Sequence, residues 1–219
     1  MTIQQIWILL LGYAVGSIPV GVLVAKRYGV DLMKVGSGNV GATNVGRVIG
    51  KGPGLFVFLM DVAKGWIPGF TATMLGEPKD FALLAGISAI IGHSFSPFLK
   101  FKGGKGIATG LGAFLGSTPI VALSAFSVFL VLFGTIRWVS VGSLAAAVSL
   151  PIFGFLFKDP TSVIVGEGLI TIFIWIRHIP NIKRLMAGTE PKFRWGGSRG
   201  IEKGAKPVDS DCETATSEQ

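Results

Sequence analysis

Charged residues are scarce in this sequence. Only 15 % of its 219 residues are Asp, Glu, Lys or Arg, whereas soluble domains carry about a quarter. Half of the residues are apolar, and the mean hydropathy is +0.63. These values exclude an ordinary soluble domain and indicate an integral membrane protein. The net charge is +8, but the basic residues lie between apolar segments, so they indicate membrane topology and anionic ligands rather than nucleic acid.

Cysteine and histidine are also rare. The single Cys212 lies in a polar C-terminal tail, which excludes an internal disulfide and a multi-cysteine metal site. The metalloenzyme pattern H-E-x-x-H does not occur. Neither histidine begins the H-x-x-x-x-D pattern of soluble acyltransferases, because His93 is followed five residues later by Phe98 and His178 by Lys183. The chemistry of this chain therefore has to be sought in other residue types.

The apolar segments predict an all-α polytopic membrane protein. The first two and the sixth are long enough to span, while the third and fourth are short enough to be buried or re-entrant. We expect the first run to be a single retained helix. A hydroxyl pair before Pro119 is a helix start signal and divides 107–136 into two helices. We therefore predict seven transmembrane helices, some of them short, near 4–25, 53–75, 81–95, 107–117, 119–136, 138–157 and 161–177.

The distribution of Lys and Arg orients these helices. Seven passes with the N-terminus outside place 17 of the 20 basic residues on the cytoplasmic side and two, Lys79 and Lys158, outside. Six passes would divide them about equally, so the positive-inside rule favours seven, with a cytoplasmic C-terminus. We expect residues 1–195 to form one membrane domain and residues 196–219 to be a polar, disordered tail.

Three polar, glycine-bearing stretches then share the cytoplasmic side. The first, Ser37–Arg47, reads SGNVGATNVGR. Glycines allow backbone N–H groups to turn toward an anion, and Arg47 offers a planar fork for phosphate. The second, Gly92–Gly106, reads GHSFSPFLKFKGGKG and ends where a helix begins, a position that favours anions. The alternatives are a capped turn for the first stretch and a basic membrane-surface loop for the second.

The third stretch, Arg177–Glu190, reads RHIPNIKRLMAGTE. His178 and Asn181 are three residues apart, so they share a face if the segment is helical. Their alternative role is interfacial capping. Within the predicted spans, Asp61 and Lys64 have the same spacing and form either a functional pair or a structural ion pair. Glu167 is a similar intramembrane acid for which the sequence indicates no partner.

Together, these three stretches resemble the bacterial family of membrane-integral acyl-phosphate:glycerol-3-phosphate acyltransferases. The resemblance implies transfer of a fatty acyl group from acyl phosphate to the 1-hydroxyl of glycerol 3-phosphate, with release of inorganic phosphate. The product would be 1-acylglycerol 3-phosphate, made for phospholipid synthesis. The resemblance further implies seven helices in the cell (inner) membrane, a cytoplasmic-side site, and no metal, acyl-CoA or other cofactor.

Carried over by motif, the resemblance assigns residues to both substrates. Arg47 and Lys105 would bind phosphate charge, and Ser37 and Asn181 would hydrogen-bond and orient the substrates. The N–H groups of Gly103, Gly104 and Gly106 would contact the anions. The full predicted site comprises Ser37, Thr43, Asn44, Arg47, Gly103, Gly104, Lys105, Gly106, His178 and Asn181, with His178, Asn181 and Ser37 as the catalytic group.

Two questions stay open at this point. His178 is either the general base or a residue that only orients the substrate while a substrate phosphate takes the proton. A transporter or flippase of a phosphorylated metabolite is the alternative function, with the same basic loops as a gate. A transporter needs polar access from both sides and is typically built from repeats, and this sequence shows no repeat.

Overall fold

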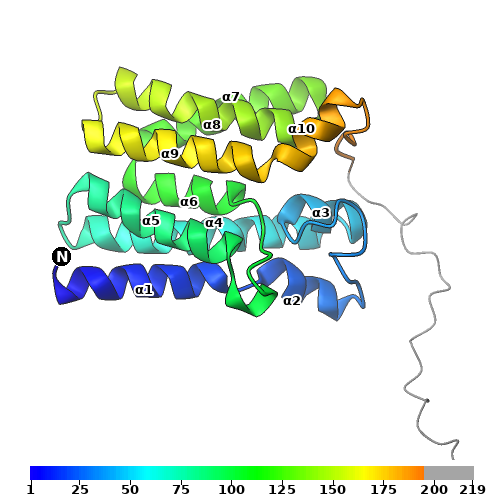
Figure 1. The fold of residues 1–219 in the computed structure, drawn as a ribbon, viewed down its shortest axis with the longest axis horizontal. Coiled ribbons are helices and arrows are strands. Elements are labelled where there is room, and N and C mark those ends of the chain that lie inside the picture. The colour runs from blue at the N-terminus through cyan, green and yellow to red at the C-terminus, as the bar shows by residue number, and fades with distance from the viewer. Residues whose placement is uncertain (195–219) are drawn as a thin grey trace, which may run out of the picture.

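Helices make up most of the chain in the computed structural model, which describes residues 1–194 (Figure 1). The predictions for the tail, 196–219, therefore lie outside the described residues. The elements, in chain order, are α1 Ile3–Ser17, α2 Val20–Arg27, α3 Ala42–Val48, α4 Lys51–Met74, α5 Lys79–Ser94, the short 3-10 helix η1 Pro97–Leu99, α6 Ile107–Ser117, α7 Pro119–Ile136, α8 Val139–Leu156, α9 Thr161–Arg177 and α10 Ile179–Met186.

The long helices lie side by side as a bundle, and the short helices α2, α3 and α10 gather at the end opposite the N-terminus (Figure 1). Many side chains on the bundle's flanks are large, apolar and exposed, for example Trp7, Leu169 and Phe155. A soluble protein would bury such residues, whereas lipid solvates them. The apolar exterior therefore agrees with an integral membrane protein.

Among residues 1–194, five spans are long and apolar enough to cross a membrane, namely Ile3–Arg27, Lys51–Met74, Lys79–Leu99, Pro119–Ile136 and Val139–Leu156. The pair α9 and α10, bent by 57° at His178, makes a sixth if it is counted as one span. The remaining predicted segment is α6, whose 11 residues extend roughly 16 Å against a hydrocarbon core of about 30 Å. All seven predicted segments are helical, and the break before Pro119 is confirmed.

The first apolar run differs from the prediction, because it is two helices rather than one. The chain leaves α1 at Ile18, whose backbone is extended, and resumes as α2 after Pro19. Proline lacks an N–H donor and disfavours a helical residue before it, which explains the break. The ammonium group of Lys64 in α4 donates to the carbonyl of Ile18 over 3.1 Å, so the break also has a polar partner inside the bundle.

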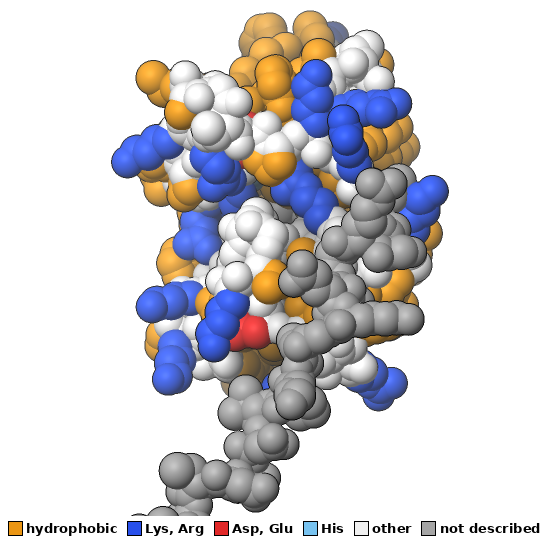
Figure 2. Space-filling view, turned by 90° about the vertical axis from the view of Figure 1, so that its right-hand side faces the viewer, with side chains coloured by type: hydrophobic (Ala, Val, Ile, Leu, Met, Phe, Trp, Pro, Cys, Tyr) orange, Lys and Arg blue, Asp and Glu red, His pale blue; other side chains and the backbone are white. Residues whose placement is uncertain are grey.

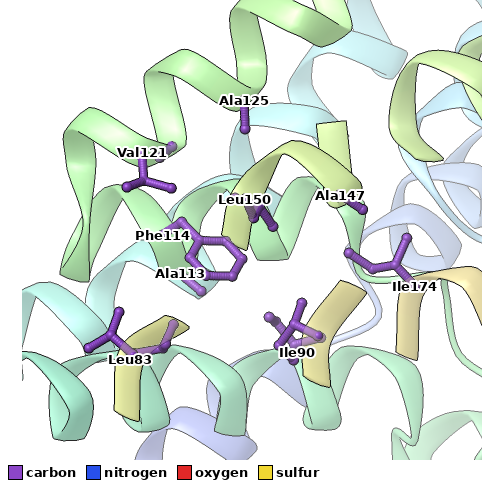
Figure 3. Packing of buried hydrophobic residues seen from close by; sticks show 12 residues of the cluster. Leu83, Ile90, Ala113, Phe114, Val121, Ala125, Ala147, Leu150 and Ile174 are labelled. Carbon is purple, nitrogen blue, oxygen red and sulfur yellow. The ribbon is translucent and has the colours of Figure 1, made fainter. Parts of the chain in front are cut away.

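Helix α6 occupies the centre of the bundle, where it packs on α4, α5 and α7. Its approach to α4 is very close: a Cβ atom at Gly65 would overlap the carbonyl oxygen of Thr109, and one at Gly112 would overlap that of Val62. Small residues on both helices thus let the two backbones touch. Figure 3 shows the apolar cluster beside α6, to which α5, α7, α8 and α9 also contribute, around Leu83, Ile90, Phe114 and Leu150.

Glu167 of α9 lies inside this packing and is fully buried. Neither of its carboxyl oxygens has a hydrogen-bond partner among the described residues. Gly154 of α8 makes room for the carboxyl group, because a Cβ atom there would overlap it. The sequence indicated no partner for Glu167, and the described part of the chain supplies none.

Candidate active site

A cavity of about 300 Å³ opens at the end of the bundle where α2, α3 and α10 gather. Its wall combines the three polar stretches with the ends of α4, α7 and α8. Figure 2, which looks onto this end, shows many Lys and Arg side chains spread across the face and few acidic ones. The predicted residues that line the cavity are Ser37, Thr43, Asn44, Arg47, Lys105, Gly106, His178 and Asn181.

The first stretch is held by Asn44, which is almost fully buried at the start of α3. Its amide oxygen accepts from the backbone N–H of Ser37 over 2.9 Å. Its amide nitrogen donates to the carbonyls of Leu32 and Val35 at 3.3 and 3.1 Å. Both ends of the amide are therefore engaged in fixing the loop that presents Ser37 to the cavity.

Arg47, one turn further along α3, reaches the segment that follows α10. Its guanidinium donates to the carbonyl of Pro191 over 3.1 Å and stacks above the ring of Phe193 at 5.8 Å. Its Nε atom is buried and has no partner among the described residues. Arg47 thus combines a fixed position at the cavity wall with an unused donor.

The second stretch differs from the prediction in its use of glycine N–H groups. The N–H of Gly103 donates to the carbonyl of Ser94 and that of Gly104 to the carbonyl of His93, at 3.1 and 3.2 Å. These two donors fold the loop back onto α5 and do not face a ligand. The backbone N–H groups of Lys105 to Thr109 donate to no atom of the described residues, as expected at a helix start. In the described part of the chain, the unpaired N–H groups of this stretch therefore begin at Lys105 and not at Gly103.

Lys105 is the lysine of this stretch that lines the cavity, and its ammonium group donates to the amide oxygen of Asn181. Burial, together with the nearby charges of Arg184, Arg47 and Arg177 and against the opposing effect of Glu190, lowers the pKa of Lys105 to about 8. A lysine with this pKa is poised to lose its proton at mildly alkaline pH when the cavity is empty. Binding of an anion would favour its charged form.

The third stretch supplies His178 at the bend between α9 and α10, and Asn181 one turn later. The Nδ1 atom of His178 lies 2.8 Å from the carbonyl oxygen of Ile174. Because a carbonyl only accepts, Nδ1 carries the proton and Nε2 keeps a free lone pair. The imidazole is thereby oriented as a hydrogen-bond acceptor in a buried position.

Glu190 organises this stretch, a role that the sequence did not reveal. One carboxylate oxygen accepts from Asn181 at 2.7 Å and from Ser140 at 2.8 Å, and the other accepts from Arg184 at 2.8 Å. Burial by itself raises the pKa of Glu190, but these hydrogen bonds and the charge of Arg184 outweigh it and lower the pKa below its ordinary value. Glu190 thus fixes the amide whose other end holds Lys105.

The floor of the cavity includes two further buried groups, Asp61 and His93. Asp61 pairs with Lys64 at 2.8 Å, and the Nδ1 atom of His93 lies 3.7 Å from the same carboxylate oxygen. Among the described residues, no cluster of three His, Cys, Asp or Glu side chains is arranged to hold a metal ion.

An apolar cavity of about 80 Å³ adjoins the polar one. The two share several lining residues, namely Phe58, Ile107, Phe126, Phe129 and Ser143. The apolar cavity then continues between α6, α7 and α8, past Phe114 and Leu150. One end of this composite site therefore suits a small anion, and the other suits a hydrocarbon chain.

Apolar, lipid-facing helices around a cavity lined by Arg47 and Lys105 define an integral membrane protein with a cationic cavity. The chain belongs to the glycerol-3-phosphate acyltransferase family, whose model matches residues 6–188. It is 42 % identical over 182 residues to the glycerol-3-phosphate acyltransferase of Trichlorobacter lovleyi, covering 83 % of this chain and 94 % of that one. It is 44 % identical over 187 residues to that of Thermus thermophilus, with 84 % and 93 % covered.

Two crystal structures are similar to this fold. Both are of PlsY, an integral membrane glycerol 3-phosphate acyltransferase, in a glycerol 3-phosphate form and a lysophosphatidic acid form. The TM-scores are 0.84 and 0.81, at 40 % and 39 % identity. Each comparison covers 87 % of this chain and 96 % of the other. The family resemblance inferred from the three stretches is thereby confirmed.

Proposed function

We propose that this chain transfers a fatty acyl group from acyl phosphate to the 1-hydroxyl of glycerol 3-phosphate, giving 1-acylglycerol 3-phosphate and inorganic phosphate. The observation that carries the proposal is the composite cavity. Two cations, Arg47 and Lys105, and unpaired N–H groups at the start of α6 line its polar part, and an apolar cavity adjoins it. Both proposed substrates carry phosphate, and one also carries a long hydrocarbon chain.

The proposed chemistry needs few catalytic groups. Acyl phosphate is an activated mixed anhydride, so holding the reactants together and stabilising the leaving phosphate can supply much of the rate. The glycerol oxygen forms a bond to the acyl carbon, the bond from that carbon to the bridging phosphate oxygen breaks, and phosphate leaves with the electron pair. In this proposal Lys105 and Arg47 stabilise the phosphate charge, and Ser37 and Asn181 orient the substrates.

The hydroxyl proton goes either to Nε2 of His178 or to a phosphate oxygen of the bound substrates. The contact between Nδ1 and Ile174 supports the first route, because it leaves Nε2 unprotonated. A His178→Gln variant separates the two. If His178 is the base, the rate constant of the chemical step falls by roughly 10² to 10⁴. If it only orients the substrate, the main loss is in KM for glycerol 3-phosphate.

Asn44 takes a different role in this proposal from the one implied by the resemblance. Because both ends of its amide hold the loop before α3, Asn44 acts by presenting Ser37 and not by contacting substrate. Gly103 and Gly104 likewise act by shaping the second loop, since their N–H groups are already paired.

We further propose seven passes through the inner membrane, with the cavity and the C-terminus on the cytoplasmic side. The basic face in Figure 2 supports this orientation. The opposite end carries the ion pair between Lys79, at the start of α5, and Asp159, after α8. Single cysteines introduced at Lys34 and Lys158 test the orientation by labelling with a membrane-impermeant maleimide. Labelling of Lys34→Cys from outside intact cells would overturn it.

The activity test uses purified protein in lipid. Palmitoyl phosphate is supplied with and without glycerol 3-phosphate, and palmitoyl-CoA is supplied separately, while phosphate and lysophosphatidate are measured. We expect phosphate release that needs glycerol 3-phosphate, lysophosphatidate as the product, and no reaction of palmitoyl-CoA. Transfer from palmitoyl-CoA alone would contradict the proposed donor.

The same assay tests the site. Arg47→Ala and Lys105→Ala should each lower kcat/KM at least roughly a hundredfold, because each removes a partly buried charge that pairs with phosphate. Lys34→Ala is the matched control, because the Lys34 side chain is 83 % exposed. Normal rates in either cavity variant would contradict the site assignment.

A further inference from the structure

Arg177, the last residue of α9, lies behind the second loop and not in the cavity wall. Its Nη2 atom donates to the carbonyl of Gly103 at 2.9 Å and to that of Gly104 at 2.7 Å. Its guanidinium lies over the ring of Phe95 at 5.6 Å. No carboxylate of the described residues forms an ion pair with it. The hydrogen bonds of this arginine thus go to two consecutive backbone carbonyls.

These two contacts determine which way the loop peptides face. In a trans peptide the C=O and N–H groups point in opposite directions. Because the carbonyl of Gly104 faces Arg177, the N–H of Lys105 points away from it, on the side where Lys105 and Gly106 line the cavity. If this peptide turned over, a carbonyl oxygen would face the bound anion, and the resulting repulsion would weaken binding.

The other side of the loop is held by the end of α5. The N–H groups of Gly103 and Gly104 donate to the carbonyls of Ser94 and His93. A Cβ atom at Gly104 would also overlap the ring of His93. The backbone of the glycine pair is therefore clamped between α5 and Arg177, and each of its polar groups has a partner. Only the donors from Lys105 onward are left for a ligand.

The positive charge of Arg177 favours binding of an anion at the start of α6, as its hydrogen bonds to the loop also do. With no acidic partner in the described chain, its positive charge is not cancelled locally. It is one of the charges that lower the pKa of Lys105, although its effect is smaller than those of burial, Arg184, Glu190 and Arg47, so its field reaches the cavity. A phosphate group bound at the start of α6 would be attracted by this charge without touching it.

We propose that Arg177 is a positioning residue for the phosphate of glycerol 3-phosphate. It sets the orientation of the Gly104–Lys105 peptide and so directs backbone donors at the anion. The proposal rests on the proposed function only in naming glycerol 3-phosphate as the ligand. Arg177 is not a catalytic residue, because it contacts the loop and not the substrate.

The test compares Arg177→Met, Arg177→Lys and the control Lys183→Ala in the full chain in lipid. Lys183 is an exposed basic residue on α10, close in sequence to Arg177. We expect Arg177→Met to raise KM for glycerol 3-phosphate by roughly ten- to a hundredfold with kcat changed far less, because a charge-assisted contact that orders the binding donors is lost. Arg177→Lys should give an intermediate KM, because a compact ammonium group cannot also stack on Phe95 in the same plane.

A role in general stability predicts a different pattern. Arg177→Ala should regain affinity for glycerol 3-phosphate when methylguanidinium is added, and not when ammonium is added, whereas mere destabilisation would not be reversed in this way. An unchanged KM in a folded Arg177→Met or Arg177→Lys variant would overturn the proposal. The proposal would also be overturned if kcat, the affinity for glycerol 3-phosphate and the melting temperature fell together in Arg177→Met, Arg177→Lys and Arg177→Ala, with no rescue by methylguanidinium.

A binding measurement separates this inference from the proposed function. Calorimetry with inorganic phosphate reports on the anion site whether or not acyl transfer occurs. If the wild-type protein binds phosphate and Arg177→Met binds it roughly tenfold or more weakly, the positioning role stands even if acyl phosphate is not the donor. Equal phosphate affinity in the two proteins would overturn it, whatever the acyl-transfer assay shows.

Discussion

The ammonium group of Lys64 lies 2.8 Å from the carboxylate of Asp61, one turn away on α4, and 3.1 Å from the carbonyl oxygen of Ile18. Both side chains are buried. A single cation therefore pairs with an acid at the cavity floor and also donates to the carbonyl of Ile18, where Pro19 separates α1 from α2. That carbonyl accepts from the N–H of Val20 as well. The pair connects the break in the first apolar run to the site.

Loss of Lys64 should strongly destabilise the protein. Lys64→Met leaves the Asp61 charge buried without its partner, and such a loss typically costs about 3–5 kcal/mol. Unfolding of the purified protein in detergent measures the effect. Combining Lys64→Met with Asp61→Asn should restore much of the stability. Lys34→Met is the control, because Lys34 and Asp31 have the same spacing but are exposed, so its effect should stay within about 1 kcal/mol. A fully stable Lys64→Met would show that the pair is dispensable.

Affinity for glycerol 3-phosphate should fall as the pH rises above about 8. Lys105 has a lowered pKa of about 8, so it carries its charge below this pH and loses it above. The phosphate of the substrate is already a dianion there, because its second pKa lies near 6. KM should therefore be nearly flat up to about pH 7, be roughly doubled at pH 8, where half of the lysine is uncharged, and rise steeply at higher pH.

A Lys105→Arg variant is the control for this pH dependence. Its guanidinium stays protonated over the whole range, so KM in the variant should show no rise. A rise of the same size in both proteins would assign the titration to another group.

Glu190→Gln should lower both stability and activity. The carboxylate accepts from Asn181, Ser140 and Arg184, and a neutral amide loses the charge-assisted contact with Arg184, worth about 1.5–3 kcal/mol. Because the pKa of Glu190 is lowered in the folded state, its stabilisation is fully present above the ordinary value of 4.5 and is lost as the pH falls through the lowered value. The variant should lack this acid-dependent loss. Glu77→Gln is the control: Glu77 follows the end of α4 and accepts from Gln5, and because a glutamine there can still accept, this variant should melt like the parent.

The C-terminal tail should be dispensable for activity, whereas the segment just before it, which contains Glu190 and Pro191, should be required. A chain truncated after Gly204 should keep full activity, since Phe193 is the last residue of the described part of the chain that lines the cavity. A chain truncated after Gly188 should be inactive, because it lacks Glu190 and the Pro191 carbonyl that receives Arg47. Both truncated proteins can be assayed with palmitoyl phosphate and glycerol 3-phosphate. Loss of activity in the longer one would show that the tail contributes to the site.

Much of this architecture could be predicted from the sequence, because it depends on local chemistry. Long apolar runs interrupted by proline and by hydroxyl residues identify helices and the break between α6 and α7. Polar, glycine-rich stretches between apolar segments have no place in lipid, which is why Ser37, Arg47, Lys105, His178 and Asn181 can be recognised without the fold. The structure brings all five to one cavity. Pro19 carries an equally local signal for a break, which the prediction of one helix over 4–25 did not use.

The remaining features depend on contacts between residues far apart in the chain. Asn181 meets Lys105 across 76 residues, Arg177 meets Gly103 across 74, and Arg47 meets Pro191 across 144. No pattern along the sequence distinguishes an arginine that holds a loop from one that faces headgroups, or a glycine N–H that is free from one already paired. Sequence alone determined that the chain is a helical membrane protein with three polar, cation-bearing loops. Only the tertiary structure decided which donors face the cavity and which are paired with the backbone around it, because helix packing selects each side chain's partner.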